Sequence, residues 1–440
     1  MANLQHYFER FLGTCVSRSF QRERPLVIGV AGSVGKTSTK TAIGIALGAH
    51  EAGTGVVMTE KNYNNELGVP LVVFGCEMPH RSPVLWLKLL GTAFCTSIGL
   101  MKLRARVFVL ELGTDKPGDL DYLISMTQPS IGVLTAIGIE HTEFFGSIEG
   151  VEREEMTLIR RLPSDGIAVV NVDDRRIMSA SASLPVRKIG FGTADTALAQ
   201  IFETRIEVDP AQPESSGLYV DVSVFGKARP LRLTGTVGRP QAYAVAAAIA
   251  CVTAIDADLT VAIRRLEEQF HGMPGRMSLI EGIKRTWLID DSYNSSPLAV
   301  ASALRDLAAF PVAEGAKRIA ALGDMRELGA LTEDAHREEG LLVAELGVDM
   351  LVVCGTLAHV VARAAKEGGM PEEHIFTFGN SAEAGLFIQD RMKQGDVILI
   401  KGSQNTVFME RVTKELMAHP ERAAQLLVRQ SADWEIKRRL

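Results

Sequence analysis

A glycine-rich segment that ends in lysine and threonine, GVAGSVGKTST at residues 29–39, carries the clearest chemical signal in this sequence. Its spacing is G-x-x-G-x-x-G-K-T. This differs from the strict G-x-x-x-x-G-K-[ST] phosphate loop because Val30 stands at the first glycine position. Glycines let backbone N–H groups curl around phosphate oxygens, and a helix that follows adds the positive end of its dipole. The segment therefore predicts a site for ATP or GTP.

Two side chains of this loop are suited to nucleotide chemistry. Lys36 can reach the terminal phosphates of the nucleotide, and Thr37 can ligate Mg²⁺. The alternative is a glycine-rich turn with a chance Gly-Lys-Thr, which the strand-like and helix-like flanks disfavour. We expect contacts with ATP from Gly32, Ser33, Val34, Gly35, Lys36, Thr37 and Ser38.

An acidic residue ends a second apolar segment, RVFVLELG at 106–113, in which Glu111 is the only acid. A carboxylate at the end of a buried strand can hold Mg²⁺ near the β- and γ-phosphates. The alternative is an ordinary solvated glutamate at a strand end. We expect the metal role for Glu111.

The elements that would position these residues alternate between strand and helix. LVIGVAG (26–32) is typical of a buried strand, and 37–50 has helical spacing. Such alternation over this length predicts an α/β protein with mostly parallel sheets. Residues 200–235 alternate apolar and polar positions, which predicts antiparallel strands at the edge of the first domain. Further strands are expected at 106–113, 131–138, 166–173, 287–293, 318–325, 349–355 and 396–403. Helices are expected at 145–161, 240–254, 297–309, 333–346 and 405–417.

Composition narrows the class of protein. The 440 residues are 46% hydrophobic and 23% charged, which is enough apolar material for more than one core. The net charge of −6 disfavours a nucleic-acid partner. The five cysteines form no C-x-x-C pair, and the N-terminus has no apolar signal core. A cytoplasmic protein is the simplest interpretation.

One segment, PVLWLKLLGTAFCTSIGLMKL at 83–103, is unusually apolar. Polar or small residues recur along it at helical spacing and leave a narrow polar stripe. The preferred interpretation is a helix packed on the body of the protein or in a dimer interface. The alternative is peripheral membrane contact, with Lys88 and Lys102 at the lipid headgroups. A full membrane span is not expected, because both lysines lie inside the segment.

The phosphate-loop variant resembles that of the Mur ligases, the ATP-dependent enzymes that add amino acids to a peptidoglycan precursor. Within the family, the resemblance is strongest to the branch that adds D-alanyl-D-alanine. The matching segments are KNYNNELGVPL (61–71), ELGTDKPGDL (111–120), IGIEHTEFFGSIEGV (137–151), PGRM (274–277), IDDSYNSSP (289–297), ALGDMRELG (321–329), AHREEG (335–340) and IKGS (400–403).

The resemblance implies a fold and a reaction. It implies a P-loop central ATPase domain at 26–272, with an apolar insertion at 83–103, and a C-terminal Rossmann-like α/β domain at 273–440. Residues 1–25 would form an N-terminal helix. ATP would phosphorylate a substrate carboxylate, and an amine would then attack it to give an amide, ADP and phosphate. The implied cofactors are ATP and Mg²⁺, and the implied partner is a small-molecule or precursor substrate.

The resemblance also implies roles for residues outside the phosphate loop. His141 would be a second metal ligand and, with Lys36 and Arg276, a catalytic residue. Residues at the domain boundary would contact the nucleotide, and loop amides would face the substrate. The nucleotide set is Gln241, Arg276, Asp291, Tyr293 and Asn294, and the substrate set is Asn62, Asn64, Asn65, Lys401 and Ser403.

Four features depart from the family pattern. Only about 25 residues precede the phosphate-loop strand, so we expect the uridine-binding domain of the family to be missing. Glu155 stands where the family has a carbamylated lysine, and it is either a metal-binding carboxylate or a solvated charge of the EREE run. Gln241 replaces an asparagine that helps to recognise adenine. Gln404 replaces an arginine, which weakens any clamp on a carboxylate.

These observations predict an ATP-dependent ligase that forms an amide between a carboxylate and an amino acid or dipeptide. Two alternatives stay open. A related ligase could use a lipid-linked or polyglutamyl-type acceptor, which the apolar insertion favours. A non-catalytic nucleotide-binding scaffold is disfavoured, because Lys36, Thr37, Glu111 and His141 occur together. The sequence does not indicate an oligomeric state.

Overall fold

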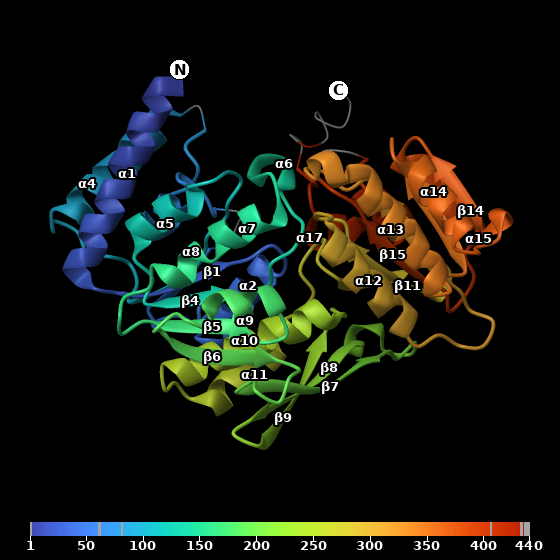
Figure 1. Ribbon diagram of the computed structural model, residues 1–440, viewed down its shortest axis with the longest axis horizontal. Coiled ribbons are helices and arrows are strands. Elements are labelled where there is room, and N and C mark those ends of the chain that lie inside the picture. The colour runs from blue at the N-terminus through green and yellow to red at the C-terminus, as the bar shows by residue number, and fades with distance from the viewer. Residues whose placement is uncertain (1, 60–62, 81, 405–406, 432–433, 435–440) are drawn as a thin grey trace.

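The computed structural model describes residues 2–59, 63–80, 82–404, 407–431 and 434. Two sheets organise this part of the chain, and Figure 1 shows them side by side with helices around them. The strands of the first sheet end at Thr234, and those of the second begin at Ser278. The α/β class with mostly parallel sheets is confirmed.

The first sheet has nine strands in the order β2-β3-β1-β4-β5-β6-β7-β8-β9. The strands from β2 to β7 pair in parallel, and the β7–β8 and β8–β9 pairs are antiparallel, as the alternation at 200–235 predicts. The strands are β1 (Leu26–Ala31), β2 (Val56–Met58), β3 (Val107–Glu111), β4 (Ile131–Leu134), β5 (Ile167–Asn171), β6 (Arg187–Gly192), β7 (Ala199–Glu207), β8 (Gly217–Val224) and β9 (Lys227–Thr234).

Helices cover both faces of this sheet and bury two separate hydrophobic clusters. One face packs against α2 (Lys36–Ala46), α10 (Arg239–Ala254) and α11 (Leu259–Gln269). Most of the buried side chains of the alanine-rich α10 are small. The other face packs against α1 (Ala2–Glu23), α3 (Gly68–Phe74), α4 (Pro83–Ser97), α5 (Asp119–Thr127), α8 (Thr157–Arg160) and α9 (Arg175–Ser181).

The second sheet has six strands in the order β10-β11-β15-β12-β13-β14, and only the β10–β11 pair is antiparallel. Helices α12 to α14 cover one face and α15 to α17 the other. The strands are β10 (Ser278–Gly282), β11 (Thr286–Asp291), β12 (Arg318–Gly323), β13 (Met350–Cys354), β14 (Ile375–Phe378) and β15 (Val397–Lys401). The helices are α12 (Pro297–Ala309), α13 (Thr332–Glu345), α14 (Ala358–Glu367), α15 (Ser381–Arg391), α16 (Glu410–Leu416) and α17 (Ala423–Leu426).

The sequence prediction missed short strands and merged short helices. Strands β2, β6, β10 and β14, of three to six residues, were not predicted, whereas strands of similar length such as β4 and β5 were. The single helix predicted at 145–161 is three pieces: α6 (Thr142–Phe145), α7 (Ile148–Glu155) and α8. Gly146 has a φ of 77° and ends α6, and the Ser147 hydroxyl accepts a hydrogen bond from Gly150 N–H and starts α7.

The helix α1 is part of the first domain's hydrophobic core. Leu12, Val16 and Phe20 are buried, and the Phe20 ring packs 5.1 Å from the ring of Phe108 on β3. The predicted helix within 83–103 is observed as α4, which packs beside α1 and α3. In Figure 1, α1 and α4 lie together at the left edge of the molecule. No described helix is both long and apolar enough to cross a bilayer.

Phe20 provides a test of how firmly α1 belongs to this core. The substitution Phe20→Ala should lower the free energy of unfolding by about 3–5 kcal/mol, because it leaves a cavity beside Phe108. Phe202→Ala on β7 is the matched control. It removes a ring that is 74% exposed and should change stability by no more than about 0.5 kcal/mol. Urea denaturation followed by circular dichroism measures both; equal effects would contradict the packing of α1.

Candidate active site

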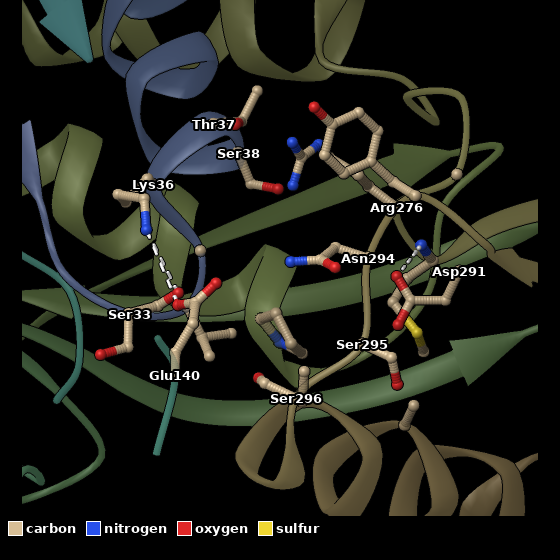
Figure 2. Close-up of a pocket in the computed structure, with 18 of the residues that line it drawn as sticks. Ser33, Lys36, Thr37, Ser38, Glu140, Arg276, Asp291, Asn294, Ser295 and Ser296 are labelled. Atoms are coloured by element: carbon tan, nitrogen blue, oxygen red, sulfur yellow. Dashed lines mark hydrogen bonds and ion pairs between the residues drawn. The ribbon is translucent and has the colours of Figure 1, made fainter. Parts of the chain in front are cut away.

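A pocket of about 310 Å³ lies between the two sheets. The first domain contributes the phosphate loop after β1, the end of β3 and the loop after β4. The second contributes the loops around β10, β11 and β15. Strand β1 lies between β3 and β4, so the chain leaves its carboxyl end at a topological switch point, where α/β sheets bind ligands. Figure 2 shows Lys36 and Glu140 on one side of the pocket and Asp291, Asn294 and Ser295 on the other.

The phosphate loop has the backbone that the sequence predicts. Gly32 has a φ of 125°, and a Cβ there would lie 2.3 Å from the Thr135 hydroxyl, so only glycine fits. Gly35 has a φ of 87° and caps α2, and a Cβ there would meet no atom within 4 Å. The N-terminus of α2 is therefore open toward the pocket, as binding of a phosphate group requires.

The Lys36 ammonium group faces three glutamates. Its Nζ donates to the carbonyl of Gly32 at 2.5 Å and lies 3.8 Å from Glu140 Oε2. Burial alone would lower the pKa of Lys36, but Glu140, Glu155 and Glu111 outweigh burial and raise it. The lysine therefore stays charged inside the pocket. Glu140 is a residue that the sequence analysis did not single out, although it stands next to His141.

Glu155 is buried, which excludes the solvated-charge interpretation. It ends α7, its side chain is 2% exposed, and its Oε2 has no hydrogen-bond partner in the described part of the chain. Burial raises the pKa of Glu155 to about 7, with Lys36 acting in the opposite direction. Its neighbours are engaged elsewhere: Glu152 contacts Arg176 at 2.9 Å, and Glu154 accepts from two backbone amides of the α5 N-terminus region.

Two of these carboxylates are fully buried beside the phosphate loop and each has an oxygen without a described partner. Glu111 is 3% exposed; its Oε1 accepts from Asn64 Nδ2 at 3.3 Å, and its Oε2 lacks a described partner, like that of Glu155. Unpartnered buried carboxylate oxygens beside a phosphate loop are suited to Mg²⁺. No group of three or more acidic, histidine or cysteine side chains among the described residues encloses a single metal position.

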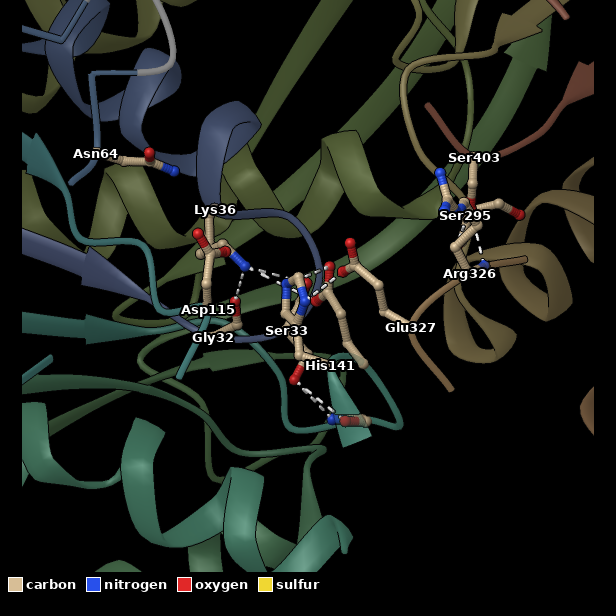
Figure 3. A network of polar contacts seen from close by, with 12 residues as sticks. Gly32, Ser33, Lys36, Asn64, Asp115, His141, Ser295, Arg326, Glu327 and Ser403 are labelled. Atoms are coloured by element: carbon tan, nitrogen blue, oxygen red, sulfur yellow. Dashed lines mark hydrogen bonds and ion pairs between the residues drawn. The ribbon is translucent and has the colours of Figure 1, made fainter. Parts of the chain in front are cut away.

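His141 connects the two domains. Its Nδ1 lies 2.6 Å from Glu327 Oε2, in the loop after β12, and its Nε2 lies 3.7 Å from Glu140 Oε1 (Figure 3). Burial lowers the pKa of His141, but the hydrogen bond to Glu327 and the charge of Glu140 raise it further, so the net shift is upward. The next residue, Thr142, donates its hydroxyl to the Leu328 carbonyl at 3.1 Å.

Of the described substrate amides, only Asn64 lines the main pocket, and both Asn64 and Asn65 line a smaller adjoining one. Asn64 lines the main pocket, where its amide contacts Glu111. Asn65 accepts a hydrogen bond from Gly68 N–H at 2.8 Å and lines a smaller adjoining pocket of about 90 Å³. Asn62 lies outside the described residues.

Two aspartates at the end of β11, the buried Asp290 and the half-buried Asp291, hold the predicted PGRM loop. Asp290 accepts from the backbone amide of Gly275 at 3.0 Å, and Asp291 from that of Met277 at 3.2 Å. Between these two points, the Arg276 guanidinium lies 4.1 Å from the centre of the Tyr293 ring, a cation–π contact. The loop therefore presents Arg276 to the pocket in a fixed position.

Lys401 and Asp291 form an ion pair at 2.5 Å, and Lys401 is 2% exposed. Lys401 also donates to the Asn294 carbonyl at 3.0 Å. Burial raises the pKa of Asp291, while Lys401 acts to lower it. Ser403 is buried outside the pocket lining and donates to the Ser295 carbonyl at 3.1 Å. The substrate roles expected for Lys401 and Ser403 stay predictions.

A second pocket of about 230 Å³ opens on the other side of Gly35. Its walls include Phe191, Tyr243 and Leu298, and Asn171 and Arg305 add polar groups. Gln241 lies between the two domains, where its Nε2 donates to the Arg276 carbonyl at 3.0 Å; its buried Oε1 has no described partner. Apart from Val34 and Gly35 of the phosphate loop, the sequence analysis did not find the residues of this second pocket, because they come from several elements far apart in the sequence.

The buried Asp291–Lys401 pair gives a double-mutant test. Asp291→Asn keeps the acceptor for Met277 N–H but leaves the Lys401 charge unpaired, so it should cost about 3–5 kcal/mol of unfolding free energy. Adding Lys401→Met should recover most of the lost unfolding free energy, because the unpaired lysine charge is then gone. Asp121→Asn breaks the exposed pair with Arg161 and should cost less than about 1 kcal/mol. Chemical denaturation measures these three variants and the unchanged protein; a double variant no more stable than Asp291→Asn would contradict the pairing.

Comparisons with known proteins agree with this geometry. Residues 94–252 match the family model of the Mur ligase middle domain, and residues 275–404 match that of the Mur ligase glutamate ligase domain. The UDP-N-acetylmuramoyl-tripeptide–D-alanyl-D-alanine ligases of Bacillus subtilis and Escherichia coli are each 27% identical to the chain. The alignments cover 90% and 89% of the chain and 76% of each relative.

Solved structures show the same architecture. The MurF ligase of Thermotoga maritima, solved in complex with ADP, superposes with a TM-score of 0.74 at 24% identity and covers 92% of this chain and 83% of its own. MurF from Acinetobacter baumannii gives a TM-score of 0.72 at 26% identity, with coverage of 91% and 79%. Both family models follow the order of the two sheets described above, and together they span about two thirds of the sequence. The chain therefore belongs to the Mur ligase family.

Proposed function

We propose that this protein is an ATP-dependent ligase that joins a carboxylate to an amine, with D-alanyl-D-alanine and a UDP-N-acetylmuramoyl-tripeptide as the first substrates to test. The observation that carries the proposal is the composition of the main pocket. A phosphate loop and unpartnered carboxylates from one domain meet Arg276 and the Asp291–Lys401 pair from the other. The names of the relatives supply the substrates.

The two pockets on either side of the phosphate loop suggest how ATP lies. We assign the base and ribose to the second pocket, whose apolar walls at Phe191, Tyr243 and Leu298 suit a purine ring. The phosphates then follow the loop past Gly35 toward Lys36. The γ-phosphate reaches the main pocket beside Arg276. Tyr293 and Asn294 line this main pocket and not the second one, which favours a position near the transferred phosphoryl group over one near adenine.

In the first step, a substrate carboxylate oxygen attacks the γ-phosphorus, and the bond to the bridging oxygen of ADP breaks. Negative charge spreads over the transferring phosphoryl group. Lys36 stays charged beside it, and Arg276 is held over Tyr293 by the pinned loop, so both cations are in position before the reaction begins. Bound Mg²⁺, held by Thr37 and Glu111 and by His141 and Glu155, would neutralise phosphate charge.

In the second step, the amine nitrogen attacks the acyl carbon, and the bond from that carbon to the phosphate oxygen breaks. The products are an amide, phosphate and a released proton. The amine must approach from the C-terminal domain, because the phosphate loop occupies the opposite wall. Lys401 supplies positive charge at this wall, although its pairing with Asp291 reduces its field. Gln404 also lines this wall and offers a neutral amide to the incoming molecule.

Lys36→Met tests the ligase assignment. It should reduce phosphate release by roughly 100-fold or more, because the charge that meets the terminal phosphates is lost. Lys366→Met, at an exposed lysine of α14, is the control and should leave the rate unchanged. The assay measures phosphate with the tripeptide precursor and the dipeptide present together and singly, and circular dichroism confirms folding. Full activity of folded Lys36→Met would contradict the assignment of this loop as the ATP phosphate site.

The same assay separates the possible acceptors. Mass spectrometry of products from a precursor pool identifies the molecule that gains mass. If the UDP-linked tripeptide gains mass, the proposed substrate is supported. If a lipid-linked or polyglutamyl-type acceptor gains mass, that acceptor is the substrate instead. ATP binding without any product in either case would leave the scaffold function as the better interpretation.

Glu155 is proposed to replace the carbamylated lysine, so activity should be indifferent to removal of CO₂ and bicarbonate. Glu155→Gln should raise the Mg²⁺ concentration needed for half-maximal rate by at least about tenfold. Glu155→Lys should lose activity and regain part of it with added bicarbonate. Glu152→Gln, on the same helix but paired with Arg176, is the control. Unchanged Mg²⁺ dependence in Glu155→Gln would remove the metal role.

A further inference from the structure

An exposed apolar stripe runs along the outer face of α4. Val84 and Leu87 are each 73% exposed, and Phe94 and Ile98 are each 50% exposed. These positions are separated by three, seven and four residues, so they lie on one side of the helix. Gly91 lies within the same stripe and has open space where a Cβ would be. The turn after the helix continues the surface with Leu100, 74% exposed, and Met101.

The opposite side of α4 explains why this stripe faces outward. Leu89 and Ala93 are buried in the first domain's core, and Trp86 stacks on Phe8 of α1 at 5.4 Å. The sequence interpretation of a helix packed on the body of the protein is therefore correct for one face only. Most of the large apolar side chains of the segment are exposed, and α4 itself lies at the edge of the molecule in Figure 1.

A basic cleft adjoins the C-terminal end of this stripe. It has a volume of about 500 Å³ and is lined by Arg22, Arg24, Lys102 and Arg106, with Glu23 as its one acid among the described residues. Arg22 donates to the carbonyl groups of Thr96 and Ser97 and so closes the end of α4.

The other cations of this surface have no close acidic partner. Within the described ranges, no acid lies within 4 Å of a charged nitrogen of Arg24, Lys88, Lys102 or Arg106. Lys88 is exposed one helical turn after Val84, at the border of the stripe. The whole chain carries a net charge of −6, so this concentration of positive charge is a local property of the α4 surface.

We propose that the α4 surface, formed by Val84, Leu87, Phe94, Ile98, Leu100 and Met101 with the adjoining basic cleft, docks on the face of an anionic lipid bilayer. The apolar stripe would enter the boundary between headgroups and acyl chains. The cations of the cleft and Lys88 would meet the phosphates of the headgroups.

Dimensions and charge both favour this occupant. At 1.5 Å per residue, the 15 residues of α4 are about 22 Å long, which is too short to span a bilayer but suits a helix lying in its plane. A second copy of the chain is a poorer partner. A two-fold contact centred on α4 would bring two surfaces that both carry positive charge toward each other.

Sedimentation with sucrose-loaded vesicles tests the proposal with the full chain and no substrate. We expect binding to vesicles of phosphatidylcholine with phosphatidylglycerol, little binding to phosphatidylcholine alone, and weakening as salt rises. The measurement needs neither ATP nor a ligase reaction, so its failure and the failure of the proposed function are distinguishable.

Matched substitutions distinguish binding through the α4 surface from nonspecific binding to vesicles. Leu87→Ser with Phe94→Ser should reduce the bound fraction to the level seen with neutral vesicles. Lys88→Gln with Lys102→Gln should weaken binding by roughly 25-fold, at about fivefold for each lysine. Phe225→Ser with Lys227→Gln changes an exposed aromatic residue and a lysine on the β8–β9 hairpin, and it should leave binding unchanged.

Three outcomes would overturn the proposal. The first is equal binding to neutral and anionic vesicles, and the second is loss of binding in the hairpin control to the same extent. The third is a lipid-free dimer, observed by analytical ultracentrifugation, that Leu87→Ser with Phe94→Ser dissociates, because the face would then belong to a second copy. Circular dichroism of each variant establishes folding, which these exposed positions should not disturb.

Discussion

The interaction on which the site depends joins the half-buried ammonium group of Lys36 to three glutamates, of which Glu111 and Glu155 are fully buried and Glu140 is half-buried. Glu111, Glu140 and Glu155 together carry more negative charge than Lys36 can balance, and one oxygen on each of them has no hydrogen-bond partner in the described part of the chain. In a low-dielectric pocket, this arrangement is stable only when further positive charge enters or a proton is bound. The site is therefore built to take cations together with phosphates.

The parallel sheet supplies the geometry for that charge arrangement. Val30 on β1 pairs with Glu111 on β3, so the phosphate loop and the first carboxylate leave adjacent strands at the same edge. The loop after β4, on the other side of β1, delivers Glu140 and His141. A sheet with β1 at its edge could not place carboxylates on both sides of one phosphate loop.

The C-terminal domain completes the pocket through strained connections. His141, Met277 and Glu327 all have positive φ values of 53°, 54° and 63°, a conformation that is costly for residues with a side chain. Each of them lies where the two domains meet around the pocket: His141 contacts Glu327, and the Met277 amide is held by Asp291. Strain of this kind persists when surrounding contacts fix it, and it is common at functional sites.

The sequence predicted the parts of the site that a local pattern specifies. The phosphate loop needs glycine at position 32 for steric reasons, and the sequence motif contains that glycine. The side of α7 that carries Glu155 was not visible, because the EREE run gives four adjacent charges and only packing decides which one is buried. The Asp291–Lys401 pair joins two strands 110 residues apart, and the walls of the second pocket come from separate elements. No local signal links such residues.

The outer face of α4 was ambiguous for a related physical reason. An apolar stripe in a sequence indicates that one face of a helix is shielded from water. The same residue pattern is compatible with a protein core and with a lipid surface. The structure resolves which residues face the core: Leu89 and Ala93 do, whereas Leu87 and Phe94 do not. The α4 surface belongs to the first domain and lies away from the domain boundary that forms the pocket. A contact made there leaves the second sheet unattached, so the C-terminal domain could still move relative to the first while the protein is held at a bilayer.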